Sequence, residues 1–348
     1  MFRSSLREIA KFDSSKLDLR TALCCIPAIA APLIAGFWFG LREGLVTAGG
    51  AMSVGFGSWQ RISRSRLLPL LWASFGMAFA AALGTLVGNG WSAVALTLAL
   101  WDFLCGVLWA LDAGAWWMSL QCAIALLIAA AFPGGLAGAG LRACLVLTGG
   151  LLQTLFALIL QPETGEPARD AQAQRFSFRP PGLRRALLRV RPHIAPRSPA
   201  FRYAVRLSVT LGACAGATRA LNLRQWYWVP MTALLVLKPD LQQTLSRGFA
   251  RIAGTLIGAA IATLIAATLR PDPPVLVVLV LVSAALCYTL LNVNYAAYAI
   301  AITAYVAFLL ALVGLPELTV VRLRVTNTAL GGLCAFFGHF LLRAPQKA

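Results

Sequence analysis

Charged side chains are scarce in this sequence, and their scarcity decides the class of protein. Only 12% of the 348 residues are charged, whereas 59% are hydrophobic and the mean hydropathy is +0.76. Soluble domains carry about 25% charged residues, so a soluble globular fold is excluded. Regular alternation of polar and apolar residues is also missing, which excludes a membrane β-barrel. Apolar runs near the ~20 residues that a helix needs to cross a bilayer recur instead, and they predict an all-α membrane protein.

Residue types that build catalytic and metal centres are also few. The chain has two histidines, and its eight cysteines all fall inside apolar runs without CxxC spacing. We expect these cysteines to be small buried hydrophobic residues, not metal ligands or disulfides. The sequence contains no P-loop, HExxH motif or nucleophile elbow, so it predicts no enzyme, no cofactor, no metal and no direct use of ATP. An intramembrane enzyme would require Asp102 and His339 to face one polar cavity.

Acidic residues are outnumbered by basic ones. The chain has 12 aspartates and glutamates against 30 lysines and arginines, which gives a net charge of +18. In a soluble protein this excess would suggest nucleic acid. In a membrane protein it predicts loops held against anionic lipid headgroups. We therefore expect membrane lipid as a partner, and no nucleic acid.

The apolar runs divide the chain into two sets of six. We expect helical spans at 20–40, 44–58, 67–88, 91–111, 115–132, 140–160, 202–221, 226–238, 251–269, 274–291, 295–313 and 320–342. The predicted domains are an N-terminal cytoplasmic segment (1–18), a first six-helix repeat (19–160), a basic cytoplasmic linker (161–198), a second six-helix repeat (199–343) and a cytoplasmic tail (344–348). The second span of each set is too short to cross a bilayer alone. Short segments in corresponding positions indicate a transporter's binding region, unless their boundaries are misplaced.

Basic residues predict the orientation of these spans. With the N-terminus in the cytoplasm, 23 of the 30 lysines and arginines fall on the cytoplasmic side, as the positive-inside rule favours. Both termini are then cytoplasmic, and six spans per half give the two halves one orientation. Equal spacings in the two halves support such a parallel repeat. They are Thr47 to Arg66 with Thr232 to Arg251, and Arg142 to Gly149 with Arg324 to Gly331.

The stretch from Trp226 to Gly258 carries the most specific pattern. It follows W-x3-T-x6-P-x7-R-x3-R-x2-G-T-x2-G, and its members are Trp228, Thr232, Pro239, Arg247, Arg251, Gly254, Thr255 and Gly258. With Arg206 before it and Arg324 after it, this pattern resembles the fusaric-acid-resistance-like membrane proteins. That superfamily includes bacterial aromatic acid exporters and, more distantly, plant aluminium-activated malate transporters. The resemblance covers the second half, and the first half joins it only through the repeat. It implies a helical bundle around a pathway and export or passive permeation of organic anions, often aromatic carboxylates, across the inner membrane.

Arginines inside apolar runs are the first candidates for pathway residues. A charge in a membrane span costs roughly 2.5 kcal/mol or more near the helix centre and is usually kept for a partner or an anion. Arg324 and Arg142 begin the last span of each half, on the outer side. Arg251 and Arg206 lie near helix starts on the inner side, where anchoring at the headgroups is the alternative. A guanidinium group binds a carboxylate through two parallel hydrogen bonds.

Polar and aromatic residues of the second half extend this candidate site. Thr232 could donate a hydrogen bond to a carboxylate, or satisfy a carbonyl of its own helix. Trp228 could stack on an aromatic substrate, or belong to the aromatic belt at the membrane interface. Tyr295 shares a helix face with Tyr298 and Tyr305, and this face could line a cavity or simply pack.

Three more residues receive a predicted role. Asp102 is the one carboxylate well inside an apolar run, so it could couple protons or pair with an arginine such as Arg20 or Arg66. Gly254 and Gly258 form a small-xxx-small face that allows a neighbouring helix to approach closely.

Together these features predict an inner-membrane permease or exporter of small organic anions, with aromatic carboxylic acids as the expected substrates. The mechanism would be secondary, driven by the membrane potential or by protons, or channel-like. The expected protein partner is either a second copy of the chain, in a homodimer, or a periplasmic adaptor. The alternative is a non-transporting membrane scaffold or a subunit of an envelope complex, in which the arginines would tolerate replacement.

Overall fold

The computed structural model describes residues 12–62, 65–110, 112–161, 195, 198–314 and 317–340. Within these ranges the chain forms helices and no β-strand, so the all-α prediction is confirmed. Seven helices are long and apolar enough to cross a membrane: α2, α4, α5, α6, α7, α11 and α12. The chain is thus a multi-pass helical membrane protein. Most of the predicted linker at 161–198, the first eleven residues and the predicted tail lie outside the described residues.

Twelve α-helices occupy the places of the twelve predicted spans. The first six are α2 (Leu19–Phe39), α3 (Leu41–Gly55), α4 (Leu67–Val87), α5 (Trp91–Trp109), α6 (Ala113–Ala130) and α7 (Leu136–Leu160). The second six are α9 (Pro199–Ala220), α10 (Trp228–Val236), α11 (Leu241–Leu269), α12 (Pro273–Leu290), α13 (Tyr295–Ala311) and α14 (Glu317–Phe340). Two short 3-10 helices, η1 (Ser14–Lys16) and η2 (Phe56–Trp59), precede α2 and follow α3.

Side-chain caps explain where several helices begin. An N-cap oxygen accepts a hydrogen bond from a backbone N–H that has no partner within the helix. The five capping residues are Asp18 of α2, Asp112 of α6, Ser198 of α9, Asp240 of α11 and Asn294 of α13. Glycine separates α2 from α3, because Gly40 adopts a φ of 125°, which L side chains rarely adopt.

The prediction that a helix begins near residue 251 is wrong. Asp240 accepts a hydrogen bond from the N–H of Gln243 at 3.0 Å and starts α11 at Leu241. The polar residues before 251 therefore form the first turns of a 29-residue helix. As a result Arg251 lies ten residues inside the helix instead of at its start.

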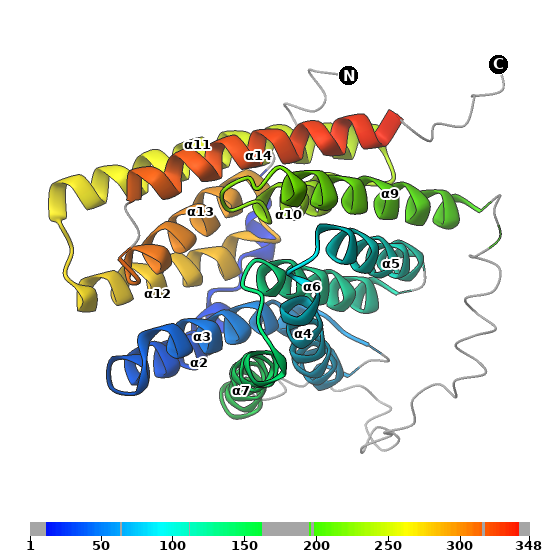
Figure 1. The fold of residues 1–348 in the computed structure, drawn as a ribbon. Helices are drawn as coiled ribbons and strands as arrows, with labels where there is room; N and C mark the ends of the chain where they lie inside the picture. The colour runs from blue at the N-terminus through cyan, green and yellow to red at the C-terminus, as the bar shows by residue number, and fades with distance from the viewer. Residues whose placement is uncertain are drawn as a thin grey trace, which may run out of the picture.

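The two halves show the same pattern of helix neighbours. In the first half α3 packs on α7, α4 on α6 and α7, and α5 on α6. In the second half the corresponding pairs are in contact: α10 with α14, α11 with α13 and α14, and α12 with α13. Between the halves, α5 packs on α9, and α12 packs on α2. Figure 1 shows α2, α3, α4 and α7 in the lower part of the view and α9, α10, α11, α13 and α14 in the upper part, with α5, α6 and α12 between them.

The second helix of each half is short, as expected, with 15 residues in α3 and nine in α10. Each is held close to the last helix of its half by a glycine. A Cβ on Gly149 of α7 would collide with the carbonyl oxygen of Thr47 in α3. A Cβ on Gly331 of α14 would lie 2.6 Å from the Cβ of Thr232 in α10. Thr47 and Thr232 have equal spacings to Arg66 and Arg251 in the sequence. In the structure each of them packs against a glycine of the last helix of its half.

Candidate functional site: a buried arginine pair beside aromatic rings

Two arginines of the second half are buried inside the helical bundle. Arg251 in α11 is 4% exposed and Arg324 in α14 is 5% exposed. At 1.5 Å per residue they lie about 15 Å and about 10 Å from the first residues of their helices. The α11 and α14 helices run side by side (Figure 1). The two guanidinium groups are close enough to repel each other electrostatically.

No carboxylate neutralises this pair in the part of the chain that the structure describes. The ion pair found there joins Lys16 to Asp13, before the first long helix. In Arg251, Nε and Nη1 are buried and have no hydrogen-bond partner among the described residues, and the same holds for Nε of Arg324. Leaving a buried charged group without a partner is costly. The pair therefore has unused donors for an anion.

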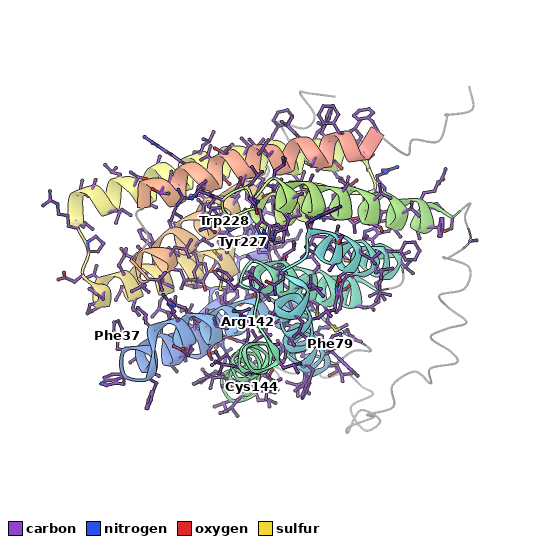
Figure 2. The ribbon with its side chains drawn as sticks, in the orientation of Figure 1. Phe37, Phe79, Arg142, Cys144, Tyr227 and Trp228 are labelled. Carbon is purple, nitrogen blue, oxygen red and sulfur yellow. The ribbon has the colours of Figure 1, made fainter. Side chains whose placement is uncertain are left out.

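Aromatic side chains surround the arginine pair. The guanidinium carbon of Arg324 lies 5.3 Å from the centre of the Trp228 ring, which is a cation–π distance. Both arginines are within electrostatic range of Tyr298 of α13 and of Cys287 of α12. Figure 2 shows Trp228 next to Tyr227 near the middle of the molecule. The site thus combines positive charge with the buried rings of large aromatic residues.

The aromatic group continues into the first half of the chain. Tyr298 contacts Phe56 of η2 with ring centres 6.0 Å apart, and Phe56 contacts Tyr288 at 4.8 Å. Tyr288 donates a hydrogen bond to the carbonyl oxygen of Met52 at 2.9 Å. Both halves therefore contribute rings beside the arginines. Sequence reasoning missed Phe56 and Tyr288, because a ring inside an apolar run gives no sign of the partner helix it faces.

The predicted tyrosine face is partly in this site. Tyr295 lies 5.8 Å from Tyr298, and the guanidinium carbon of Arg247 lies 4.8 Å from the centre of the Tyr295 ring. The hydroxyl groups of Tyr295 and Tyr305 are buried and without a hydrogen-bond partner among the described residues. These hydroxyl groups could donate to a bound acceptor.

Small and hydroxyl residues set the spacing of the helices around the site. A Cβ on Gly254 would lie 2.5 Å from the Cβ of Ala299, and one on Gly258 would lie 2.5 Å from the carbonyl oxygen of Ile300. Both contacts bring α11 against α13. Thr255, between these glycines, has a buried hydroxyl oxygen with no partner among the described residues. Thr232 is 3% exposed and lies against Gly331.

Arg142 occupies a different environment from Arg324, its counterpart by spacing. Its Nη1 donates hydrogen bonds to the hydroxyl oxygen of Thr85 at 2.7 Å and to the carbonyl oxygens of Phe132 at 2.6 Å and Ala129 at 3.3 Å. These carbonyls belong to the end of α6 and the turn that follows it. Figure 2 shows Arg142 well below Trp228, among the first six helices. Arg142 therefore holds a helix end and is not part of the arginine pair.

Arg206 also lies apart from the pair. Its Nη1 is 3.2 Å from Nδ1 of His339 and 3.4 Å from the carbonyl oxygen of Pro239, to which it donates a hydrogen bond. Arg206 therefore joins α9, α14 and the connection between α10 and α11.

Asp102 of α5 is fully buried. Neither carboxylate oxygen has a hydrogen-bond partner among the described residues. The described part of the chain contains no ion pair from Asp102 to Arg20 or Arg66.

The comparison with protein families identifies the part of the chain that holds the arginine pair. Residues 212–338 match the family described as fusaric acid resistance protein-like. The second half is therefore similar to this family over these residues. The resemblance predicted from the Trp228–Gly258 pattern is thereby confirmed for these residues.

Several relatives share segments with this chain. The inner membrane protein YccS of Escherichia coli is 32% identical over 152 residues, which are 44% of this chain and 21% of the relative. The uncharacterized transporter YdhK of Salmonella typhimurium is 31% identical over 171 residues, 46% of this chain and 25% of the relative. A protein named ORF2 from Neisseria gonorrhoeae is 31% identical over 147 residues, 42% of this chain and 35% of the relative. The chain thus spans only about a fifth to a third of these relatives. No solved structure matches it.

The residues that match this family contain most of the candidate site. Arg251, Arg324, Trp228 and Tyr298 all fall within residues 212–338, as do Thr232, Tyr295 and the two packing glycines. Arg142, Arg206 and Asp102 lie before residue 212. The match therefore includes the buried arginine pair and leaves out the other charged residues that the sequence analysis selected.

Proposed function

We propose that this protein is an inner-membrane permease that exports organic anions, with aromatic carboxylates as its substrates, by a secondary or channel-like mechanism. The observation that carries the proposal is the pair Arg251 and Arg324, buried side by side without a carboxylate partner among the described residues. Charged residues inside membrane helices usually face the bundle interior and mark an ion or substrate pathway.

A carboxylate would stabilise this arrangement. Two guanidinium groups in one buried site repel each other and lose their hydration. One carboxylate between them gains charge-assisted hydrogen bonds, each typically worth about 1.5–3 kcal/mol. The unpartnered Nε atoms of both arginines supply donors for this purpose.

The surrounding rings favour an aromatic substrate over an aliphatic one. Trp228 and Tyr298 lie next to the arginine pair, and Phe56 extends the aromatic surface from the other half. Offset or edge-to-face ring contacts add about 0.5–1.5 kcal/mol beyond the area they bury. A carboxylate attached to a ring would satisfy both features of the site at once.

The membrane setting supplies a driving force. The proposal includes two parallel six-helix repeats with both termini in the cytoplasm, which the matching helix neighbours of the two halves and the distribution of basic residues support. YccS is named an inner membrane protein and YdhK an uncharacterized transporter, and these names agree with the proposed membrane location and transport role. A cell-negative interior drives a monovalent anion outward by roughly 2.3 kcal/mol per 100 mV.

Flux measurements in proteoliposomes test the proposal. Purified protein would be reconstituted with benzoate, a hydroxybenzoate or succinate inside, and efflux would be measured at an imposed potential. Arg251→Gln and Arg324→Gln should each reduce benzoate efflux by about 10- to 100-fold, the effect of losing a charge-assisted hydrogen bond. Arg322→Gln is the matched control, because Arg322 is exposed on the same helix. No flux from folded wild-type protein, or equal flux in all variants, would refute the proposal and favour the scaffold.

A further inference from the structure

A second group of charged and polar side chains is buried where the two halves meet. Asp102 lies on α5, which packs on α9 of the other half and on α6. Its side chain is 0% exposed, and both carboxylate oxygens lack a hydrogen-bond partner among the described residues. The hydroxyl oxygen of Ser119, on α6, is also buried and lacks a hydrogen-bond partner among the described residues.

The charged and titratable neighbours of Asp102 come from several elements. Cys105, one turn further along α5, is within electrostatic range of both Asp102 and Lys238. Tyr203 of α9 is within range of Asp102, Arg206 and Arg247. Arg206 contacts His339, and Arg247 lies over the Tyr295 ring. Cys122 of α6 is the remaining titratable neighbour of Cys105.

Lys238 is a buried cation that shares Cys105 as a neighbour with Asp102. It lies in the connection between α10 and α11 and is only 5% exposed. Its ammonium nitrogen is 4.5 Å from the centre of the Trp116 ring of α6, the helix that also carries Ser119. No ion pair joins Lys238 to Asp102 in the described conformation.

The charge state of Asp102 follows from its surroundings. An ionised carboxylate with neither ion pair nor hydrogen bond is strongly disfavoured in a buried site, and such a group takes up a proton instead. The described conformation therefore fits a protonated Asp102. Loss of that proton would create a buried negative charge that needs a positive partner.

We propose that Asp102 is a proton-binding site that couples proton movement to anion export. This inference rests on the proposed transport function. When the O–H bond of Asp102 breaks, the proton passes to water on one side of the membrane. The carboxylate later takes a proton from the other side.

Two measurements on the full chain test the inference. The first is proton movement, reported by a pH-sensitive dye inside the proteoliposomes during benzoate efflux. Asp102→Asn imitates the protonated carboxyl group but cannot release a proton. It should keep benzoate exchange while proton movement falls to the level of protein-free liposomes. Asp102→Glu, which can still titrate, should keep proton movement. Benzoate-coupled proton movement that is unchanged in Asp102→Asn would overturn the inference.

The second measurement does not depend on transport. Infrared spectroscopy of the purified protein should show the carbonyl band of a protonated carboxylic acid, which shifts in heavy water and is lost in Asp102→Asn. A band that does not depend on Asp102 would overturn the proton site. A band that depends on Asp102, in a protein without anion flux, would refute the transport function while supporting the proton site.

Discussion

The guanidinium carbon of Arg324 lies 5.3 Å from the centre of the Trp228 ring, so a fixed positive charge and a large aromatic face belong to one site. The two residues are almost a hundred positions apart and come from α14 and α10, which pack against each other. Together they offer a positive charge for a carboxylate group and an aromatic face for a ring, the two chemical features of an aromatic carboxylate. Under the proposed function their contact would also give α10, the shortest α-helix that the structure describes, a direct role in substrate selection.

Replacing Trp228 should change selectivity more than rate. Trp228→Leu removes the ring but keeps an apolar side chain, so the preference for benzoate over succinate should fall by about 2- to 10-fold, the equivalent of one ring contact. Trp228→Phe should keep most of the preference. Competition between the two anions in proteoliposome efflux measures this ratio. An unchanged ratio in Trp228→Leu would remove Trp228 from the site.

Arg142 should behave as a structural residue. Arg142→Met leaves the carbonyl oxygen of Phe132 without its donor, whereas that of Ala129 still accepts the N–H of Phe132, so the protein should lose about 1–3 kcal/mol of stability. Benzoate efflux per folded molecule should remain close to the wild-type value. Thermal unfolding in detergent, followed by tryptophan fluorescence, measures the first effect. A large loss of efflux in a variant of normal stability would instead place Arg142 in the pathway.

The glycines between α11 and α13 should not tolerate a side chain. Gly254→Ala would place a methyl group 2.5 Å from the Cβ of Ala299, and overpacking of this kind costs about 1–3 kcal/mol. Gly49→Ala, in α3, is the control, because a Cβ there meets nothing within 4 Å. Alanine is favoured over glycine in a helix by roughly 0.5–1 kcal/mol, so this control should unfold at the same temperature as the wild type or higher. Equal unfolding temperatures for the two variants would contradict the close approach.

Two cysteines offer a direct test of helix packing in the second half. The thiols of Cys214 in α9 and Cys334 in α14 are within hydrogen-bonding reach of each other. In a variant that keeps only these two of the eight cysteines, a mild oxidant should join them. Loss of maleimide labelling and mass spectrometry of the linked peptides would detect the bond. A variant that keeps Cys214 and Cys144 instead is the control, because Cys144 lies on α7 of the other half and is exposed. Failure to cross-link the first pair under denaturant-free conditions would contradict the packing of α9 on α14.

Hydropathy alone located the twelve helices, because each follows an apolar run bounded by glycine, proline or charged residues. The start of α11 could not be found this way, since its first turns are polar and only the cap by Asp240 marks them. This error placed Arg251 at a helix start and concealed how far inside α11 it lies. Arg142 and Arg324 each lie seven residues before a glycine pair, but this equal spacing did not predict their surroundings. Arg142 contacts Thr85 and the end of α6, whereas Arg324 contacts Trp228. Helices that are apolar on every face carry no signal for which neighbour they contact, so the meeting of α5 with α9 became visible only in the structure.

The length of α11 makes the anion site sensitive to the thickness of the bilayer. Its 29 residues extend over about 43 Å, whereas the hydrocarbon core of a membrane is about 30 Å thick. At the average tilt of about 20° the helix still exceeds the core by roughly 10 Å. If this excess lies at the polar start of α11, Gln242, Gln243 and Arg247 reach the headgroups and Arg251 sits just inside the hydrocarbon boundary. Lipids with longer acyl chains would then draw Arg251 deeper and raise the energy of the empty site, so hydrophobic mismatch becomes a means of tuning anion affinity.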